Sequence, residues 1–121
     1  MAHKPPLNWV EIVVLPRKFE VRPVCPEVWA GFEPLRVTVD WKGNKDEWLA
    51  VRVQGFTDSE GRPLPTNPDH LEFYPSEGEV VKQLDFTSRI RDDAYCKYEI
   101  EYQRKEPPET LIVDPTLRLK R

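Results

Sequence analysis

The residues best suited to acid–base chemistry are few and widely spaced along the chain. The 121 residues include two histidines, His3 and His70. Histidine is the most frequent general acid or base, but His70 follows an Asn-Pro-Asp tripeptide at the end of a loop, where a solvated side chain is favoured over a catalytic one. No pair of carboxylates is selected by its spacing, and the sequence has no nucleophile elbow, phosphate loop or HExxH motif. We therefore predict no catalytic residues and a protein that is not an enzyme.

Metal sites and disulfides depend on how histidine, cysteine and methionine are spaced along the chain. A mononuclear copper site takes two histidines, a thiolate and a weak axial ligand. The chain offers His3, His70, Cys25, Cys96 and Met1, at spacings that do not match. There is no CxxC pair for zinc, so we predict no metal and no cofactor. The two cysteines are expected to be free thiols, and a disulfide between them stays open as the alternative.

Aromatic side chains are the remaining candidates for recognition. The chain has 4 tryptophans, 4 tyrosines and 5 phenylalanines. Exposed rings can form a protein-binding hot spot or a platform on which sugars stack. Two alternatives stay open: Trp29 could close one end of the fold, and Trp48 could pack in a sheet that is covered on both sides. The candidate partner-binding residues are Trp29, Phe32, Trp48 and Tyr95.

The elements that must position these rings are β-strands, because the apolar pattern has a period of two. Clear alternation occurs over 34–42, 47–54 and 94–103, with Trp41 and Tyr98 on inward faces. The first two runs are expected to form a hairpin. Tyr95 takes the outward parity of its run, and Trp48 takes the outward parity opposite Leu49, Val51 and Val53.

Proline shapes the rest of the chain, which has 13 prolines and only 5 glycines. Proline disfavours long helices, and only residues 88–93 could hold a helical turn. The run 110–119 contains Pro115, so this strand is expected at an edge or with a bulge. A loop rich in proline is expected over 57–69. Shorter strands are expected at 9–15, 19–21, 71–74 and 80–86.

Two segments near the C-terminus resemble a known family. Residues 95–102 and 111–119 are similar to the last two strands of small bacterial cupredoxin-like sandwiches, in which a YKYxVxV strand precedes a closing strand with DPxIxxR. Tyr95, Lys97 and Asp114-Pro115 carry the likeness, which implies the fold. Such proteins often lack copper ligands, and this chain lacks the histidine and methionine that a copper-binding member places near its final strands.

An immunoglobulin-like topology is related to this expectation. The order Cys25, Trp41, Cys96 imitates the cysteine, tryptophan and cysteine of an immunoglobulin domain, although alanine occupies position 94, where such a domain has tyrosine. We predict one all-β domain over residues 1–121: an antiparallel β-sandwich, immunoglobulin-like or cupredoxin-like, with seven to eight strands.

Charge and hydropathy limit the function further. The formal net charge is -3. Nonspecific nucleic-acid binding needs a concentrated basic face, so we do not expect nucleic acid as a partner. No apolar stretch approaches the roughly 20 residues of a membrane helix, and the N-terminus does not resemble a secretory signal. We expect a soluble cytoplasmic module that binds a protein partner, as an accessory subunit of an assembly. A carbohydrate-binding module that uses the exposed aromatic residues is the alternative.

Overall fold

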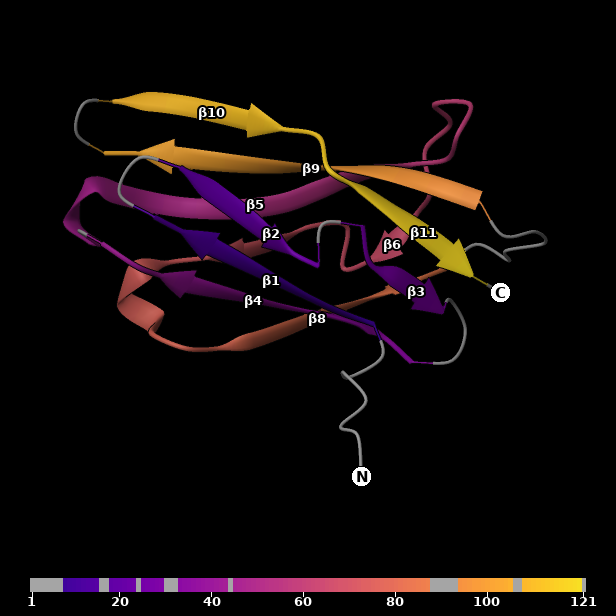
Figure 1. The fold of residues 1–121 in the computed structure, drawn as a ribbon, viewed down its shortest axis with the longest axis horizontal. Helices are drawn as coiled ribbons and strands as arrows, with labels where there is room; N and C mark the ends of the chain where they lie inside the picture. Colours follow the sequence, from indigo (N-terminus) through magenta and orange to yellow (C-terminus); the bar gives the residue numbers. More distant parts are fainter. Residues whose placement is uncertain are drawn as a thin grey trace.

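The computed structural model describes residues 8–15, 18–23, 25–29, 33–43, 45–87, 94–105 and 108–120. These residues form eleven β-strands and two short 3₁₀-helices and contain no α-helix, so the predicted all-β class is confirmed (Figure 1). The expected count of seven to eight strands is too low. In chain order the elements are β1 (Trp9–Val14), β2 (Phe19–Arg22), β3 (Glu27–Trp29), β4 (Leu35–Trp41), η1 (Lys45–Glu47), β5 (Trp48–Thr57), β6 (Thr66–Asn67), β7 (Leu71–Phe73), η2 (Pro75–Glu77), β8 (Val81–Phe86), β9 (Ala94–Arg104), β10 (Glu109–Val113) and β11 (Thr116–Lys120).

The strands form two sheets around one shared apolar core. The five-stranded sheet has the order β2-β1-β4-β8-β6, and the six-stranded sheet has the order β3-β11-β9-β5-β7, with β10 also paired to β9. Buried apolar side chains from both sheets meet in a single cluster. Each sheet therefore has an inner face in the core and an outer face on the other side.

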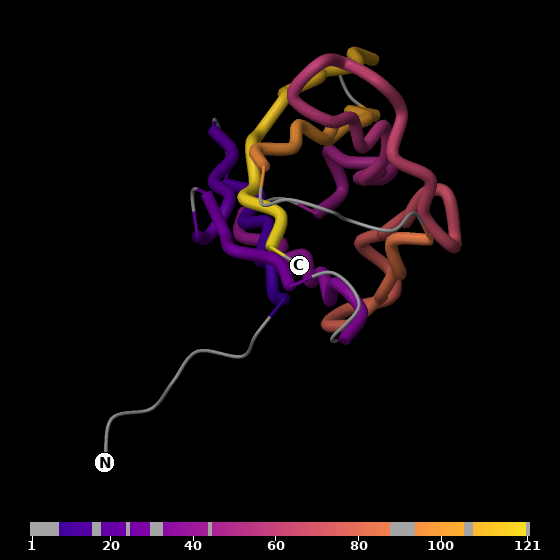
Figure 2. The backbone as a smooth tube through the Cα atoms, turned by 90° about the vertical axis from the view of Figure 1, so that its right-hand side faces the viewer, coloured from indigo at the N-terminus to yellow at the C-terminus, as the bar shows by residue number. Residues whose placement is uncertain are grey.

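Both sheets contain a parallel pair of strands. β1 runs parallel to β4, and β3 runs parallel to β11. Figure 2 shows the yellow end of β11 beside the purple segment of β3. The expectation of purely antiparallel sheets is wrong. A parallel pair needs a crossover connection, and here the chain leaves the five-stranded sheet after β2, forms β3 in the other sheet and returns as β4.

The hairpin expected between 34–42 and 47–54 is also wrong, although both strands are present. β4 pairs with β1 and β8, whereas β5 pairs with β9 and β7. The two strands share a pattern because both bury one face in the same core, β4 through Val37 and β5 through Val53. A period of two identifies the buried face of a strand but not its neighbour in the sheet.

An irregularity at the start of β5 reverses the faces of two side chains. The register against β9 shifts between Trp48 and Ala50, and again between Gln54 and Thr57. A bulge adds one residue to a strand and changes the face that the side chains beyond it take. As a result Trp48 is buried, with 6% of its surface exposed, and Leu49 is 51% exposed. The sequence predicted the opposite for both.

The C-terminal strands follow the sequence more closely. β9 buries Cys96, Tyr98, Ile100 and Tyr102, as predicted. The run 110–119 divides at Pro115 into β10 and β11, which pair with the two halves of β9. Proline cannot donate a ladder hydrogen bond, so the pairing of one strand stops there and the next begins.

Asn8 connects the two sheets at the start of β1. Its side chain accepts a hydrogen bond from the Trp29 N–H (2.6 Å) and donates to the carbonyl oxygens of Trp29 (2.9 Å) and Glu33 (2.7 Å). Its own carbonyl oxygen accepts from the Arg36 N–H (2.7 Å). Asn8 is buried and has a φ of 55°, a left-handed conformation that asparagine adopts more readily than most residues. This residue therefore fixes β3 of one sheet against the first strand of the other.

The possible helical turn at 88–93 lies outside the described residues. Within the described ranges, no helix is long and apolar enough to cross a membrane.

Candidate functional site

Two of the four candidate aromatic residues lie on one outer face, formed by β3, β11 and β9. Arg118 in β11 is paired with Tyr95 on one side and Glu27 on the other, and Lys120 is paired with Trp29. Residues paired across strands, or two apart along a strand, share a face of the sheet. Trp29 (38% exposed) and Tyr95 (59% exposed) therefore point to the same side. We name this surface the Trp29–Tyr95 face; its residues are Glu27, Trp29, Tyr95, Lys97, Arg118 and Lys120.

Positive charge predominates on the Trp29–Tyr95 face, which carries three cations and one carboxylate. Arg118 Nη1 lies 3.8 Å from Glu27 Oε1, and Lys120 Nζ lies 5.8 Å from the centre of the Trp29 ring. Exposed ion pairs and cation–π contacts of this kind each contribute at most about 1 kcal/mol. The interactions within the face are therefore weak enough to be exchanged for contacts with a partner.

The other two candidate residues do not join this face. Trp48 packs in the core against Phe19 and Tyr102, with ring centroids 5.2 and 6.5 Å apart. The predicted outward position of Trp48 is wrong, because the register shift in β5 turns the indole inward. Phe32 lies outside the described residues.

His70 lies beside two carboxylates. Its Nδ1 lies 2.8 Å from Asp69 Oδ1, and its Nε2 lies 3.8 Å from Glu72 Oε1. Both residues precede β7, so strand alternation does not separate their side chains. The histidine is exposed at the surface, as expected for a solvated side chain.

The two cysteines are free thiols, as predicted. Cys25 is exposed and Cys96 is buried. Burial raises the pKa of the Cys96 thiol to about 12, so this thiol is protonated at neutral pH and lacks the thiolate that a nucleophile needs. Among the described residues, no group of three histidine, cysteine or carboxylate side chains could hold a metal ion.

A self-paired polar network covers part of the same six-stranded sheet. The Glu72 carboxylate accepts hydrogen bonds from the Tyr74 hydroxyl and the Arg52 guanidinium, and these two contacts hold the pKa of Glu72 below its usual 4.5. Lys82 Nζ donates to the Glu72 carbonyl oxygen (2.5 Å) and lies 3.0 Å from Glu77 Oε2. The hydrogen bond from Lys82 lowers the pKa of Glu77. These charges are paired with one another within the chain, so this network is a weaker candidate for recognition than the Trp29–Tyr95 face.

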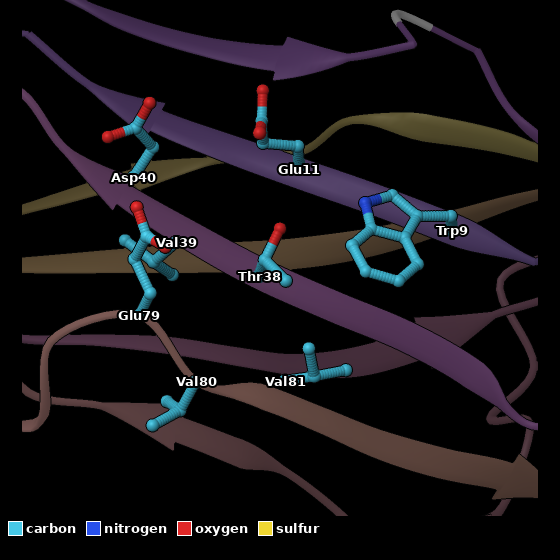
Figure 3. Close-up of a pocket in the computed structure, with 8 residues that line it drawn as sticks. All are labelled: Trp9, Glu11, Thr38, Val39, Asp40, Glu79, Val80 and Val81. Carbon is cyan, nitrogen blue, oxygen red and sulfur yellow. The ribbon is translucent and has the colours of Figure 1, made fainter. Parts of the chain in front are cut away.

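The outer face of the five-stranded sheet holds a groove that the sequence reasoning missed. Glu11 in β1 lies beside Thr38 in β4, and Thr38 lies beside Val81 in β8. Figure 3 shows the Trp9 ring at one end of the groove, Asp40 and the carboxylate of Glu79 at the other, and Glu11 and Thr38 between them. We name this feature the acidic groove. Its volume is about 360 Å³, and its lining residues are Trp9, Glu11, Thr38, Val39, Asp40, Glu79, Val80 and Val81.

A weak signal for the acidic groove exists in the sequence. Trp9 and Glu11 have the same parity in β1, as do Thr38 and Asp40 in β4. Because 9–15 is apolar on both faces, its sequence does not show that Trp9 and Glu11 point outward. No sequence pattern indicates that β1 lies beside β4. Glu79 precedes β8 and falls in no alternating run.

The two outer faces differ in charge and shape. The Trp29–Tyr95 face is basic and is formed by β3, β11 and β9. The acidic groove is a hollow with three carboxylates in its lining. Comparison of the chain with protein-family models, with curated proteins and with solved structures found no match in any of the three.

Proposed function

We propose that this chain is a non-enzymatic binding module that recognises a protein partner through the Trp29–Tyr95 face, as an accessory subunit of a larger assembly. The observation that carries the proposal is the position of Trp29 and Tyr95 on one outer face, with Arg118 in the strand between them. Tryptophan, tyrosine and arginine are the residues most enriched at the energetic centres of protein interfaces.

The charge of the face indicates the chemistry of the partner. Lys97, Arg118 and Lys120 outnumber the single carboxylate of Glu27, in a chain whose net charge is -3. Complementary charge accelerates association and excludes partners of the wrong sign. We expect a partner surface that presents aspartate or glutamate around an apolar centre.

Side chains, rather than a free strand edge, would make the contacts. β3 is an edge strand, and an open edge can accept an added strand. At Trp29, however, both the N–H and the carbonyl oxygen are already bonded to Asn8. This arrangement favours recognition by the outer face over strand addition at this point.

Site-directed crosslinking in the native cells tests the proposal. A photo-crosslinking phenylalanine at position 95 should capture a specific protein, whereas the same group at exposed Ser59, in the 57–63 loop, should not. The affinity of the purified partner is then measured for Trp29→Ala, Tyr95→Ala and Arg118→Glu, each expected to weaken binding at least about tenfold. Leu49→Ala removes an exposed apolar side chain elsewhere and is the matched control. Unchanged affinity in all three face variants would refute the proposal.

A carbohydrate-binding module is the alternative use of the same rings. Stacking on a sugar requires an open ring face, and Lys120 Nζ already lies 5.8 Å above the Trp29 ring. Titration of the chain with a panel of neutral oligosaccharides, followed by NMR, separates the two functions. Saturable shifts at Trp29 and Tyr95 would favour the sugar; an unchanged spectrum would favour the protein partner.

The finer fold and the location are part of the same proposal. We infer an immunoglobulin-like or cupredoxin-like sandwich with mixed sheets; its support is the single core shared by two sheets and the pairing of β9 with β11. We also propose a cytoplasmic location. The free, exposed thiol of Cys25 supports it, because thiols stay reduced in that compartment.

A further inference from the structure

The three carboxylates of the acidic groove have few cationic neighbours. Lys42 Nζ lies 3.6 Å from Asp40 Oδ2. Glu11 and Glu79 form no ion pair with any residue in the described part of the chain. All residues that line the groove are acidic, neutral or apolar. The hollow therefore offers negative charge that the chain itself only partly neutralises.

The arginines that border the groove are directed to other carboxylates. Arg22 is paired across β1 and β2 with Glu11, but its guanidinium lies 2.5 Å from Glu20 Oε2. Arg36 is paired with Trp9, but its guanidinium lies 4.0 Å from Glu33 Oε2. These two guanidinium groups are thus engaged with carboxylates outside the groove.

Apolar groups accompany the charge. Val81 is 55% exposed in the lining of the groove, and the half-buried Trp9 ring closes one end. Val81 and Trp9 therefore add apolar surface to the carboxylates of the groove.

We propose that the acidic groove binds a lysine or arginine side chain of a peptide. The aliphatic stem would lie along Val81 and the edge of Trp9, and the cationic head would lie among Glu11, Asp40 and Glu79. A cation is also attracted by the face of an indole ring. A carboxylate oxygen of the groove would accept a hydrogen bond from an amide N–H of the peptide backbone. This site is separate from the Trp29–Tyr95 face and does not depend on it.

The size of the groove limits the affinity that one side chain can reach. About 360 Å³ is near the lower end of the volumes of ligand sites. Exposed ion pairs and cation–π contacts are individually weak, so a single side chain is expected to bind with a dissociation constant in the millimolar range. A longer basic peptide would gain affinity from additional contacts. Binding should weaken as salt concentration rises, because salt screens exposed charges.

NMR titration of the whole isotope-labelled chain tests the proposal with N-acetyl-lysine N-methylamide as the probe. We expect saturable shifts at amides of β1, β4 and β8 and at the Trp9 indole. Glu11→Gln and Asp40→Asn should each weaken binding at least about threefold, as expected for the loss of one exposed charge contact. Glu60→Gln removes an exposed carboxylate that belongs to neither the groove nor the Trp29–Tyr95 face; it is the matched control and should leave the affinity unchanged. The dispersion of each spectrum shows whether the variant is folded.

Two further probes separate this ligand from others. N-acetyl-norleucine N-methylamide has a similar stem without charge and should cause no shifts; equal binding would overturn the proposal, because the carboxylates would then be irrelevant. The n-butylammonium ion has the stem and charge without the peptide amides and should bind more weakly. Equal affinity for n-butylammonium would show that the peptide amides do not contribute. It would overturn the proposal of a peptide ligand and indicate that the groove binds free amines. Unaltered affinity in Glu11→Gln and Asp40→Asn, or the same shifts with a neutral oligosaccharide, would also overturn it.

Discussion

The two outer faces of this molecule combine a tryptophan with charged side chains, but the sign of the charge is opposite. Trp29 lies beside Lys120 on the six-stranded sheet, and Trp9 lies in a groove with Glu11 and Asp40 on the five-stranded sheet. The net charge of -3 conceals this separation. Charge sign, rather than aromatic content, therefore distinguishes what each face can recognise.

One buried residue adjoins both faces. Asn8 precedes Trp9 in the chain, and its side chain is bonded to the backbone of Trp29. The groove and the Trp29–Tyr95 face are thus positioned by a common point in the fold, although their side chains act independently. Substitutions can test which residues belong to the framework and which belong only to a face.

The largest expected effect separates a core tryptophan from a surface one. Trp48→Ala should lower the free energy of unfolding by about 4 kcal/mol, because it removes a large buried side chain and leaves a cavity. Trp29→Ala should lower it by less than about 1 kcal/mol. Urea denaturation of both variants measures the difference. Similar losses would mean that Trp29 is a structural residue and that its face was assigned wrongly.

Asn8→Ala should have the next largest effect, about 3 kcal/mol. The substitution leaves the backbone groups of Trp29 and Glu33 without their buried partners, and each such loss costs roughly 1–3 kcal/mol. NMR spectra should show changes near both Trp9 and Trp29. Gln83→Ala, at an exposed position of β8, is the control. A loss below about 0.5 kcal/mol would contradict the role of Asn8 as the common support.

Acid should affect the paired carboxylates of the six-stranded sheet. The Tyr74 hydroxyl and Arg52 hold the pKa of Glu72 below 4.5 in the folded chain. Stabilisation from a lowered pKa is present above the unfolded-state value and is lost as pH falls through the folded-state value. Glu72→Gln should therefore be less stable at pH 7 and lose less stability than the wild type between about pH 5 and pH 3.

Urea unfolding between about pH 5 and pH 3 measures how the free energy of unfolding depends on pH. Glu79→Gln, in the acidic groove, is the control. Glu79 is exposed and forms no ion pair with a described residue, so its variant should follow the wild-type curve. A Glu72→Gln curve parallel to that of the wild type would show that the contacts with Tyr74 and Arg52 do not contribute to acid stability.

The smallest expected effect concerns the bulge in β5. Leu49→Gln should change the free energy of unfolding by less than about 0.5 kcal/mol, because Leu49 is exposed. The alternation of 47–54 predicted that this leucine is buried. A loss of 2 kcal/mol or more, which is typical of truncation of a buried leucine, would mean that Leu49 is buried. The strand would then be regular, with Trp48 on the surface.

The sequence was sufficient for features that depend on one strand at a time. The period of two correctly predicted β4 and β9 and their buried faces, and Pro115 lies where the single strand expected over 110–119 divides into β10 and β11. It also placed Tyr95 outward. These features follow from the local geometry of a strand, in which adjacent side chains point to opposite faces.

Features that depend on two or more strands could not be predicted in this way. The expected hairpin failed because the pattern does not identify the neighbour of a strand. Trp48 was misplaced because a bulge depends on pairing with β9. The acidic groove joins β1, β4 and the start of β8, so its residues come together only once the sheet order is known.

The central claim is that the two outer faces are separate recognition surfaces of opposite charge. The indole N–H signals of the chain's four tryptophans test it most directly, in one NMR experiment on the whole protein. N-acetyl-lysine N-methylamide should shift the Trp9 signal, N-acetylglutamate N-methylamide should shift the Trp29 signal, and neither probe should shift the signal of buried Trp48. A shift of Trp9 and Trp29 by the same probe, or of neither by any probe, would contradict the account.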